Sequence, residues 1–282
     1  MLTHLMMATL LSVPLPQQTD TVVSVSPGAR LDVHAMSGEV VVRTWDRAEM
    51  RVVASHGSRD RVEISTSATV ARVRVKAYRG APSAVDLEIT VPAGMDVDLG
   101  GTFLDIDIQG VSGEVTAETV HGNVVLRGGR GIVRLHSTQG TVECEEAEGR
   151  IEVGTMNGSL RLRNVAGEIT GETVNGSIIV ERASARSAEL VTVNGEVTYD
   201  GTVRDGGRYL LNSHNGDITF SVPPSTNATM SVSTFSGEFV ADFAVTLSET
   251  SSGGRRFSFV LGNGSARVEL ESFGGTIHLR RP

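Results

Sequence analysis

Glycines recur at a fixed interval through the middle of this chain, and that interval restricts the fold more than any other feature of the sequence. Eight of them follow one another in uninterrupted nine-residue steps: Gly113, Gly122, Gly131, Gly140, Gly149, Gly158, Gly167 and Gly176. A single globular core imposes no such period, whereas a protein built from stacked copies of one unit does. The spacing therefore predicts a repeat architecture.

Apolar and polar residues alternate within each nine-residue unit. The second residue after each glycine is Val, Ile or Leu, and the third is in most units polar or charged. Period-two alternation predicts that each unit is a short β-strand followed by a turn, with the second and fourth residues after the glycine facing inward. A further apolar or small residue stands two positions before several of the glycines: Val120, Thr138, Ala147, Met156, Val165 and Val174.

Alternate units resemble each other more than neighbouring units do, which indicates that two units make one coil of about 18 residues. Thr or Ser precedes every second glycine by three residues, as in Thr119, Ser137, Thr155 and Thr173. Asn-Gly pairs, including the pair that ends at Gly195, predict sharp corners because both residues accept unusual backbone angles. We expect the Thr and Ser hydroxyls to form local bonds at these corners.

Outward charges support the same coil length. Stacking of two-unit coils places Arg127 beside Glu145 and Arg163 beside Glu181, with Glu143 facing Arg161, so that the sign alternates from coil to coil. Opposite charges on neighbouring strands are favourable and like charges are not. The sequence thus predicts an all-β fold, a single-stranded β-helix or β-solenoid with capped ends.

The flanks of the regular region are less periodic. Residues 19–92 contain strand-like runs that we interpret as a cap and first coils, and residues 93–282 as the regular solenoid with its closing coils, the two forming one continuous domain. Ser272-Phe273-Gly274-Gly275-Thr276-Ile277 is one more copy of the repeat, and it is expected to close the stack. An open end of a solenoid is a sheet edge, which must be covered or charged.

The first residues predict export. Met1–Pro16 form a short apolar run that is followed by polar residues, and this run is shorter than the roughly 20 apolar residues that a membrane-spanning helix needs. A signal peptide over residues 1–18 fits this pattern, and it implies a periplasmic, cell-surface or secreted protein. No later stretch is apolar enough to cross a membrane.

The net charge and the cysteine content exclude several classes of function. The formal charge of −8 argues against a nucleic-acid partner, whose phosphates attract clustered Lys and Arg. Cys144 is the single cysteine, so the chain has no internal disulfide and no cysteine zinc site, and its position predicts a buried apolar role.

Several short segments resemble one known family. They are Gly113-Glu114-Val115-Thr116, the segment 175–180 (NGSIIV), the segment 87–94 (LEITVPAG), the segment 215–223 (NGDITFSVP) and Gly275-Thr276-Ile277. They resemble bacterial putative adhesins with β-strand repeats, a domain family of unknown function, over about residues 30–281. The resemblance implies a β-solenoid in an exported or envelope-associated protein, and it supplies no catalytic residues.

The spacing of the aspartates and histidines argues against a metal site. Asp96 and Asp98 stand nine residues before Asp105 and Asp107, which is half a coil, so the two pairs should lie on opposite faces rather than share a Ca²⁺ ion. The calcium β-roll pattern lacks its aspartates here. Among the histidines, His121 and His214 are read as replacing the turn Asn of other copies. No cofactor or metal site is predicted.

Three functions remain compatible with the sequence. The first is a non-enzymatic binding or scaffold module of the cell envelope, with an envelope protein or a glycan as partner. The second is a carbohydrate-active enzyme that uses Arg134, Arg150, Glu152 and Glu172 on one solenoid face. The third is a cytoplasmic, cytoskeletal-type solenoid that polymerises end to end. The only site residues predicted are structural turn glycines, namely Gly195 and the eight of the nine-residue series.

Overall fold

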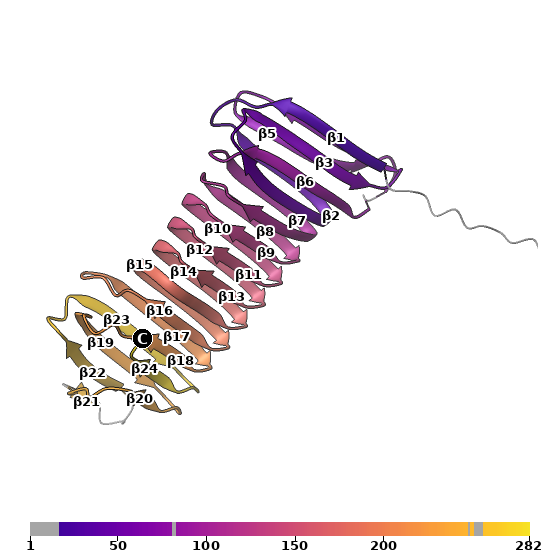
Figure 1. Ribbon diagram of the computed structural model, residues 1–282. Helices are drawn as coiled ribbons and strands as arrows, with labels where there is room; N and C mark the ends of the chain where they lie inside the picture. The colour runs from indigo at the N-terminus through magenta and orange to yellow at the C-terminus, as the bar shows by residue number, and fades with distance from the viewer. Residues whose placement is uncertain (1–16, 81–82, 248, 251–255) are drawn as a thin grey trace, which may run out of the picture.

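The computed structural model describes residues 17–80, 83–247, 249–250 and 256–282. Within these residues the protein is all-β and contains no helix, which confirms the all-β part of the expected fold class. The chain winds into a long column of coils that runs the length of the molecule, with larger strand groups at its two ends (Figure 1). The predicted signal peptide lies outside the described residues except for Gln17 and Gln18, which belong to the first strand.

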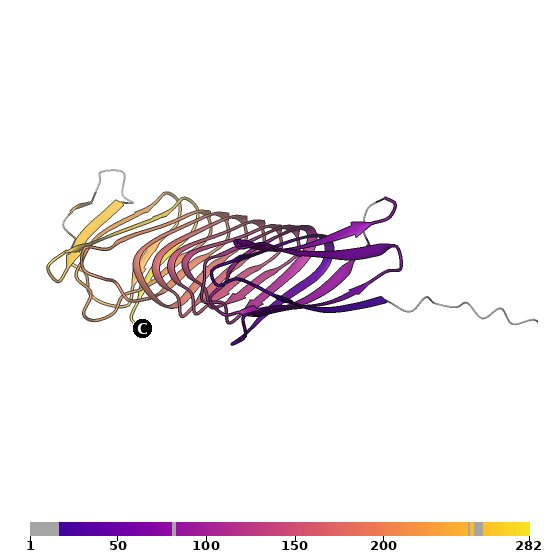
Figure 2. The same cartoon turned by 90° about the horizontal axis from the view of Figure 1, so that it is seen from above.

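Each coil contributes one strand to each of two facing sheets, here called sheet A and sheet B. Figure 2 shows the coils obliquely, as a row of flattened loops that follow one another along the column. The two sheets are continuous because β2 (Arg30–Trp45), β7 (Asp96–Gln109) and β15 (Ile178–Asn194) bend from one into the other.

Sheet A contains, in spatial order from the N-terminal end, β4 (Asp60–Thr66), β5 (Val70–Ala77), the first half of β2, the first half of β7, β8 (Val115–His121), β10 (Arg130–Gln139), β12 (Glu148–Asn157), β14 (Ala166–Asn175), the second part of β15, β17 (Arg208–Asn215), β23 (Ala266–Ser272), β19 (Ala228–Thr234), β22 (Arg256–Leu261) and β21 (Glu249–Thr250).

Sheet B contains, in the same direction, β1 (Gln17–Ser24), β3 (Glu49–His56), β6 (Val85–Pro92), the second half of β2, the second half of β7, β9 (Val124–Arg127), β11 (Val142–Glu145), β13 (Leu160–Arg163), the first part of β15, β16 (Val197–Gly201), β18 (Ile218–Ser221), β24 (Ile277–Arg280) and β20 (Phe239–Ala241).

The central strands pair in parallel at a constant register. Val124, Val142, Leu160 and Ile178 lie side by side in sheet B, so consecutive partners are 18 residues apart. The interval then lengthens to 19 residues at Val197 and to 21 at Ile218. The longer coils enclose larger side chains, and the buried rings of Tyr199 and Phe220 stack there at 5.2 Å.

The inward positions are the ones that the alternation predicts. The second and fourth residues after the glycines of both unit types are buried, including Val133, Leu135, Val142, Cys144, Ile151, Val153, Leu160 and Leu162. Transfer of each Val, Leu or Ile side chain out of water stabilises the fold by roughly 1.5–3 kcal/mol. One coil exposes its upper and lower surfaces, so this burial is complete only when coils stack.

The C-terminal copy of the repeat does not close the stack, contrary to expectation. Its strands β23 and β24 lie between the coil of β17 and β18 and the coil of β19 and β20. Ile218 therefore pairs with Ile277, which is 59 residues further along the chain. The coil of β19 and β20 is the last one, and the antiparallel strand β22 covers its sheet A edge.

The N-terminal end is arranged in a similar way. Beyond β2, sheet A continues into β5 and the antiparallel β4, and sheet B continues into β6 and the antiparallel pair β3 and β1. Val40 of β2 pairs with Ile106 of β7, so the early copy of the repeat around Gly38 stacks directly on the coil of β7, and β5 and β6 pair in parallel with its other side. Antiparallel strands thus flank the parallel stack at both ends.

Candidate functional site

One corner of the column carries a line of exposed apolar side chains. The residue two positions before the corner residue, which is a glycine in every coil except at Leu104, falls in the same place in every coil because the flanking residues pair in register from β2 to β19. We call this line the corner ladder; its members, in spatial order, are Met36, Thr102, Val120, Thr138, Met156, Val174, Val193, His214, Phe273 and Phe235. Seven of the thirteen large apolar side chains exposed in the described part of the chain belong to it.

The exposure of the corner ladder distinguishes it from the opposite corner. Met156 is 51% exposed and Val174 is 40% exposed, whereas Ala147 and Val165, which stand equally before their own glycines, are buried. Left-handed residues cause the difference, because Glu146 with φ 59° and Asn164 with φ 52° turn the residue that follows each into the interior. A large apolar strip on a soluble surface marks an interaction site more often than an isolated apolar residue does.

Aromatic stacks extend the corner ladder at its C-terminal end. The rings of His214 and Phe273 stack at 4.8 Å, and those of Phe273 and Phe235 at 4.7 Å. The register places His214 beside Val193, so the expectation that it replaces a turn Asn is wrong. His121 does occupy that Asn position, and its ring stacks on Phe103 at 4.8 Å.

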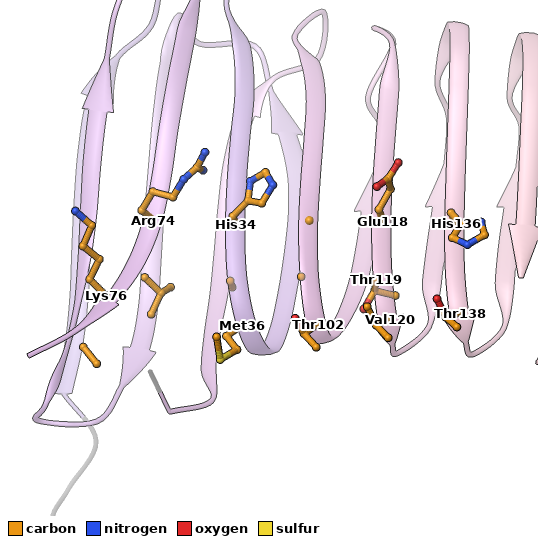
Figure 3. A pocket seen from close by; sticks show the side chains of 15 residues that line it. His34, Met36, Arg74, Lys76, Thr102, Glu118, Thr119, Val120, His136 and Thr138 are labelled. Carbon is orange, nitrogen blue, oxygen red and sulfur yellow. The ribbon is translucent and has the colours of Figure 1, made fainter. Parts of the chain in front are cut away.

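Two shallow hollows lie on the outer surface of sheet A beside the corner ladder. The first has a volume of about 840 Å³, and its wall is formed by Arg74 and Lys76 at one end and by Glu118 and His136 at the other (Figure 3). Gly100 supplies the depth because it has no side chain, and a Cβ atom there would meet the ring of His34 at 2.9 Å. Met36, Thr102, Val120 and Thr138 of the corner ladder form the rim that Figure 3 labels.

The second hollow repeats this arrangement further along the column. It has a volume of about 660 Å³ and shares Glu118 and His136 with the first. Gly154 is its floor, and a Cβ atom there would meet the ring of His136 at 2.9 Å. Glu172 lies on the far side of Gly154. The two hollows form one interrupted groove that runs parallel to the corner ladder.

The four residues of the enzyme hypothesis all line the second hollow. Arg134 Nε lies 2.9 Å from Glu152 Oε2, and Arg150 Nε lies 2.7 Å from Glu152 Oε1. Partial burial acts to raise the pKa of Glu152, but the hydrogen bonds from the two arginines outweigh it, so the net pKa of the carboxyl is below its ordinary value. Glu152 is therefore held as a carboxylate, whereas a glycosidase general acid needs a raised pKa.

Hydrogen bonds between coils hold the corner in place. Ser137, Thr155, Thr173 and Thr192 each donate from the side-chain hydroxyl to the carbonyl of the corner glycine one coil back. The expected local bonds are therefore bonds between coils. Thr119, which also lines the first hollow, is buried, and its hydroxyl has no partner among the described residues.

An amide row lies beside the corner ladder on the side away from the hollows. It consists of Gln139, Asn157, Asn175, Asn194 and Asn215, which follow each other in register. Asn175 Nδ2 donates to Asn157 Oδ1 at 2.8 Å, and Asn194 Nδ2 donates to Asn175 Oδ1 at 2.8 Å. This flank of the ladder is neutral, and its hydrogen bonds fix the spacing of the corner.

The nine predicted turn glycines divide between the two corners. Gly122, Gly140, Gly158, Gly176 and Gly195 lie at the corner that bears the ladder, and Gly113, Gly131, Gly149 and Gly167 lie at the opposite one. A Cβ atom on Gly140, Gly158 or Gly176 would overlap the carbonyl oxygen of the glycine one coil back. Gly131 favours glycine for a conformational reason instead, because its φ of 82° lies in the left-handed region.

The predicted charge pairs on sheet B form in part. Arg127 Nε lies 3.4 Å from Glu145 Oε2, and Arg163 Nε lies 3.2 Å from Glu181 Oε2. Glu143 and Arg161 are neighbours in register, but they are not among the ion pairs of the described residues.

The acidic cluster divides as its spacing predicts, with Asp96 and Asp98 on sheet A and Asp105 and Asp107 on sheet B. Asp96 Oδ1 accepts a hydrogen bond from the backbone N–H of Glu114 at 2.9 Å. In the described part of the chain, no group of three or more His, Cys, Asp or Glu side chains is placed to hold a metal ion. That part also lacks a helix with the length and apolarity needed to span a bilayer.

Comparison with known proteins gives a family and several distant structural likenesses. The model of the family described as Toastrack DUF4097 matches residues 8–280. None of the curated proteins matches the chain.

Three solved structures are similar at low sequence identity. A putative adhesin from Bacteroides fragilis is 11% identical, with 93% of this chain and 97% of that chain covered and a TM-score of 0.45. A putative adhesin from Parabacteroides distasonis is 12% identical, with 93% and 97% covered and a TM-score of 0.44. A putative cell adhesion protein from Clostridium sporogenes is 11% identical, with 95% and 100% covered and a TM-score of 0.25. At these TM-scores the likenesses carry no functional inference.

Proposed function

This chain belongs to the Toastrack DUF4097 family, and from that premise we propose that it is a non-enzymatic, adhesin-like binding module of the cell envelope. The surface that binds is the corner ladder together with the groove of sheet A beside it. The single observation that supports this function is the concentration of exposed apolar side chains along one corner of a soluble column. The turn glycines and hydroxyls at the same corner serve a structural role, because they keep the ladder residues in line.

The column itself suits a binding role better than a catalytic one. A ladder with one side chain per coil, at a spacing of about 4.8 Å, presents a long straight surface. Enzymes concentrate their chemistry in a concave pocket, whereas both hollows here are open and shallow. The candidate catalytic carboxylate, that of Glu152, already forms ion pairs with Arg134 and Arg150.

End-to-end polymerisation receives less support. Polymerisation would require the parallel coils to continue from one molecule to the next. The antiparallel strands β1, β3 and β4 at one end and β22 at the other change the strand direction there. A scaffold role for the single column remains part of the proposal.

Export and the domain organisation complete the proposal. Residues 1–18 act as a signal peptide, residues 19–92 as the cap with the first coils, and residues 93–282 as the solenoid with its closing coils. N-terminal sequencing of the mature protein together with cell fractionation tests export. A mature protein that begins at Met1 and stays in the cytoplasm would contradict it.

Binding to purified envelope fragments tests the role of the corner ladder. In a pull-down assay, Met156→Ser combined with Val174→Ser should reduce the amount of protein retained on the fragments at least about fivefold, because two adjacent apolar contacts are lost. The matched control is Val125→Ser with Ile179→Ser, two outward apolar residues of sheet B. Equal retention of both double variants and the unmodified protein would refute the proposed surface.

A further inference from the structure

A row of carboxylates runs parallel to the corner ladder. The row consists of the residues two positions before the ladder residues in each strand, and from β8 to β23 these are Glu118, His136, Gly154, Glu172, Val191, Asn212 and Glu271. We call it the acidic row. Glu118, Glu172 and Glu271 are exposed, and they recur at every third strand, which is a spacing of about 14 Å.

Fixed cations do not neutralise the acidic row. None of its three carboxylates is in an ion pair within the described part of the chain, and the row contains no Lys or Arg. Arg134 of the next row and Arg150 of the row beyond it are both paired with Glu152. The row therefore presents uncompensated negative charge along one side of the corner ladder, while the amide row on the other side is neutral.

The difference in charge between the two flanks of the corner ladder indicates the chemistry of the partner. An apolar line with negative charge on one flank only is complementary to a surface with an apolar stripe and positive charge on the matching flank. The same negative charge disfavours an anionic lipid surface, which attracts basic segments instead.

The spacing of the ladder favours a helical partner. Ladder side chains recur about every 4.8 Å, and an α-helix repeats its apolar stripe every turn, about 5.4 Å, so the two depart by about 0.6 Å per turn and by about 3.5 Å over the six steps from Val120 to Phe273. Side chains on one face of an extended strand recur about every 6.7 Å and lose register within two positions. The two hollows, floored by Gly100 and Gly154, provide space for side chains beside the ladder.

We propose that the corner ladder and the acidic row together bind a basic amphipathic helix of a partner protein, laid along the axis of the column. The apolar stripe of the helix packs on Val120, Met156, Val174, Val193 and Phe273, and its lysines or arginines lie against Glu118, Glu172 and Glu271. This inference rests on the proposed function, because it names the partner class of the same surface.

Isothermal titration calorimetry with synthetic peptides tests the inference on the full chain. The probe is a helical peptide of about 21 residues, which is about 30 Å long and so covers the ladder from Val120 to Phe273. It carries leucines on one stripe and lysines on one flank, and the control peptide has glutamates in place of the lysines. We expect the lysine peptide to bind at least about tenfold more tightly, and to weaken as salt rises from about 50 to 500 mM, since salt screens exposed charges.

Charge variants separate the acidic row from the net charge. Replacement of Glu118, Glu172 and Glu271 by Gln should weaken binding of the lysine peptide about tenfold. The matched control removes three charges from sheet B through Glu39→Gln, Asp86→Asn and Glu143→Gln, and it should change the affinity less than about twofold. All six side chains lie at the surface, so the melting temperatures of both triple variants should stay close to that of the unmodified protein.

The outcomes distinguish this inference from the proposed function. Equal affinity for the lysine and glutamate peptides, or equal weakening by the two triple variants, overturns the basic-helix inference. Binding to glycans or to protein-free neutral vesicles that the Met156→Ser/Val174→Ser variant abolishes, with no peptide preference, also overturns it but leaves the proposed surface standing. Absence of binding both to peptides and to envelope fragments refutes the inference and the proposed function together.

Discussion

Thr155 donates a hydrogen bond from its Oγ1 to the carbonyl oxygen of Gly140, 3.0 Å away and one coil back. The same bond joins Ser213 to Gly195 and Ser272 to Gly216 near the C-terminal end. In each case the residue that carries the hydroxyl is buried. The same carbonyl oxygen also lies so close to the corner glycine of the next coil that a Cβ atom on that glycine would overlap it. The corner that bears the exposed ladder is therefore built from paired side-chain and glycine positions in adjacent coils.

Replacement of Thr155 by Val should lower the free energy of unfolding by about 1 kcal/mol. The shape of the side chain is kept while the hydroxyl donor is lost and the Gly140 carbonyl loses a partner. Chemical denaturation followed by circular dichroism measures the change. Thr155→Ser is the control, and because Ser137 fills the same position in another coil, it should cost less than about 0.5 kcal/mol. A Val variant as stable as the Ser variant would show that the bond contributes nothing.

Gly158→Ala should destabilise the column much more, by about 3 kcal/mol or more, because the added methyl group would overlap the carbonyl oxygen of Gly140. The coils would have to separate locally, which breaks parallel hydrogen bonds on both sides. Gly94→Ala is a suitable comparison, since a Cβ atom at Gly94 meets nothing within 4 Å. Thermal denaturation should separate the two variants clearly, and similar melting temperatures would refute the steric explanation.

Much of this column could be predicted from the alternation of residues. Val142 and Leu160 stand at the second position after their glycines, and both are buried as expected. The exposure of the corner ladder could not be predicted in this way, because Met156 and Val165 have the same place relative to a glycine and the same apolar character. The difference depends on the left-handed backbone of Asn164, which only the folded turn reveals.

The spatial order of the C-terminal coils also could not be predicted from the repeat pattern. The copy around Gly275 matches its neighbours in sequence, but the match does not show which neighbours it contacts. The intervening segment contributes the antiparallel pair β19 and β22, and the chain then returns to fill the position next to β17. Strand pairing between segments so far apart in the chain, as between Ile218 and Ile277, leaves no local signal.

Ile151→Asp should severely destabilise the protein, because Ile151 is completely buried between β10 and β14 neighbours, and the new carboxylate would have no partner there. We expect a loss of at least about 4 kcal/mol, or failure to accumulate as folded protein. Glu143→Ala, on the outer surface of sheet B, should change stability by less than about 0.5 kcal/mol. Identical melting curves for the two variants would contradict the inward assignment.

The stability of the N-terminal end should depend on pH through Asp32. Its side chain is 12% exposed, and it receives hydrogen bonds from Arg72 Nε at 3.0 Å and Arg74 Nη2 at 2.9 Å. Burial acts to raise the pKa of Asp32, but the two arginines outweigh it, so the folded-state pKa lies below the ordinary value.

A carboxyl group with a lowered folded-state pKa stabilises the protein when the pH is above the group's unfolded-state pKa of about 3.9. This contribution is lost as the pH falls through the folded-state pKa. Urea denaturation between about pH 5 and pH 2 should therefore show a smaller decrease in the free energy of unfolding for Asp32→Asn than for the unmodified protein. At pH 5 and above, the variant should already be the less stable of the two. Parallel pH profiles would mean that Asp32 does not contribute.

Cys144 reports on the interior of the column. Its side chain is 1% exposed at an inward position of β11, and burial raises the pKa of the thiol to about 12. Since the thiolate is the reactive form, the folded protein should release no chromophore from Ellman's reagent at about pH 8. In guanidinium chloride the same assay should detect one thiol per chain, because Cys144 is the only cysteine. Reaction of the folded protein at the rate of free cysteine would show that sheet B opens at β11 and would contradict a closed apolar interior.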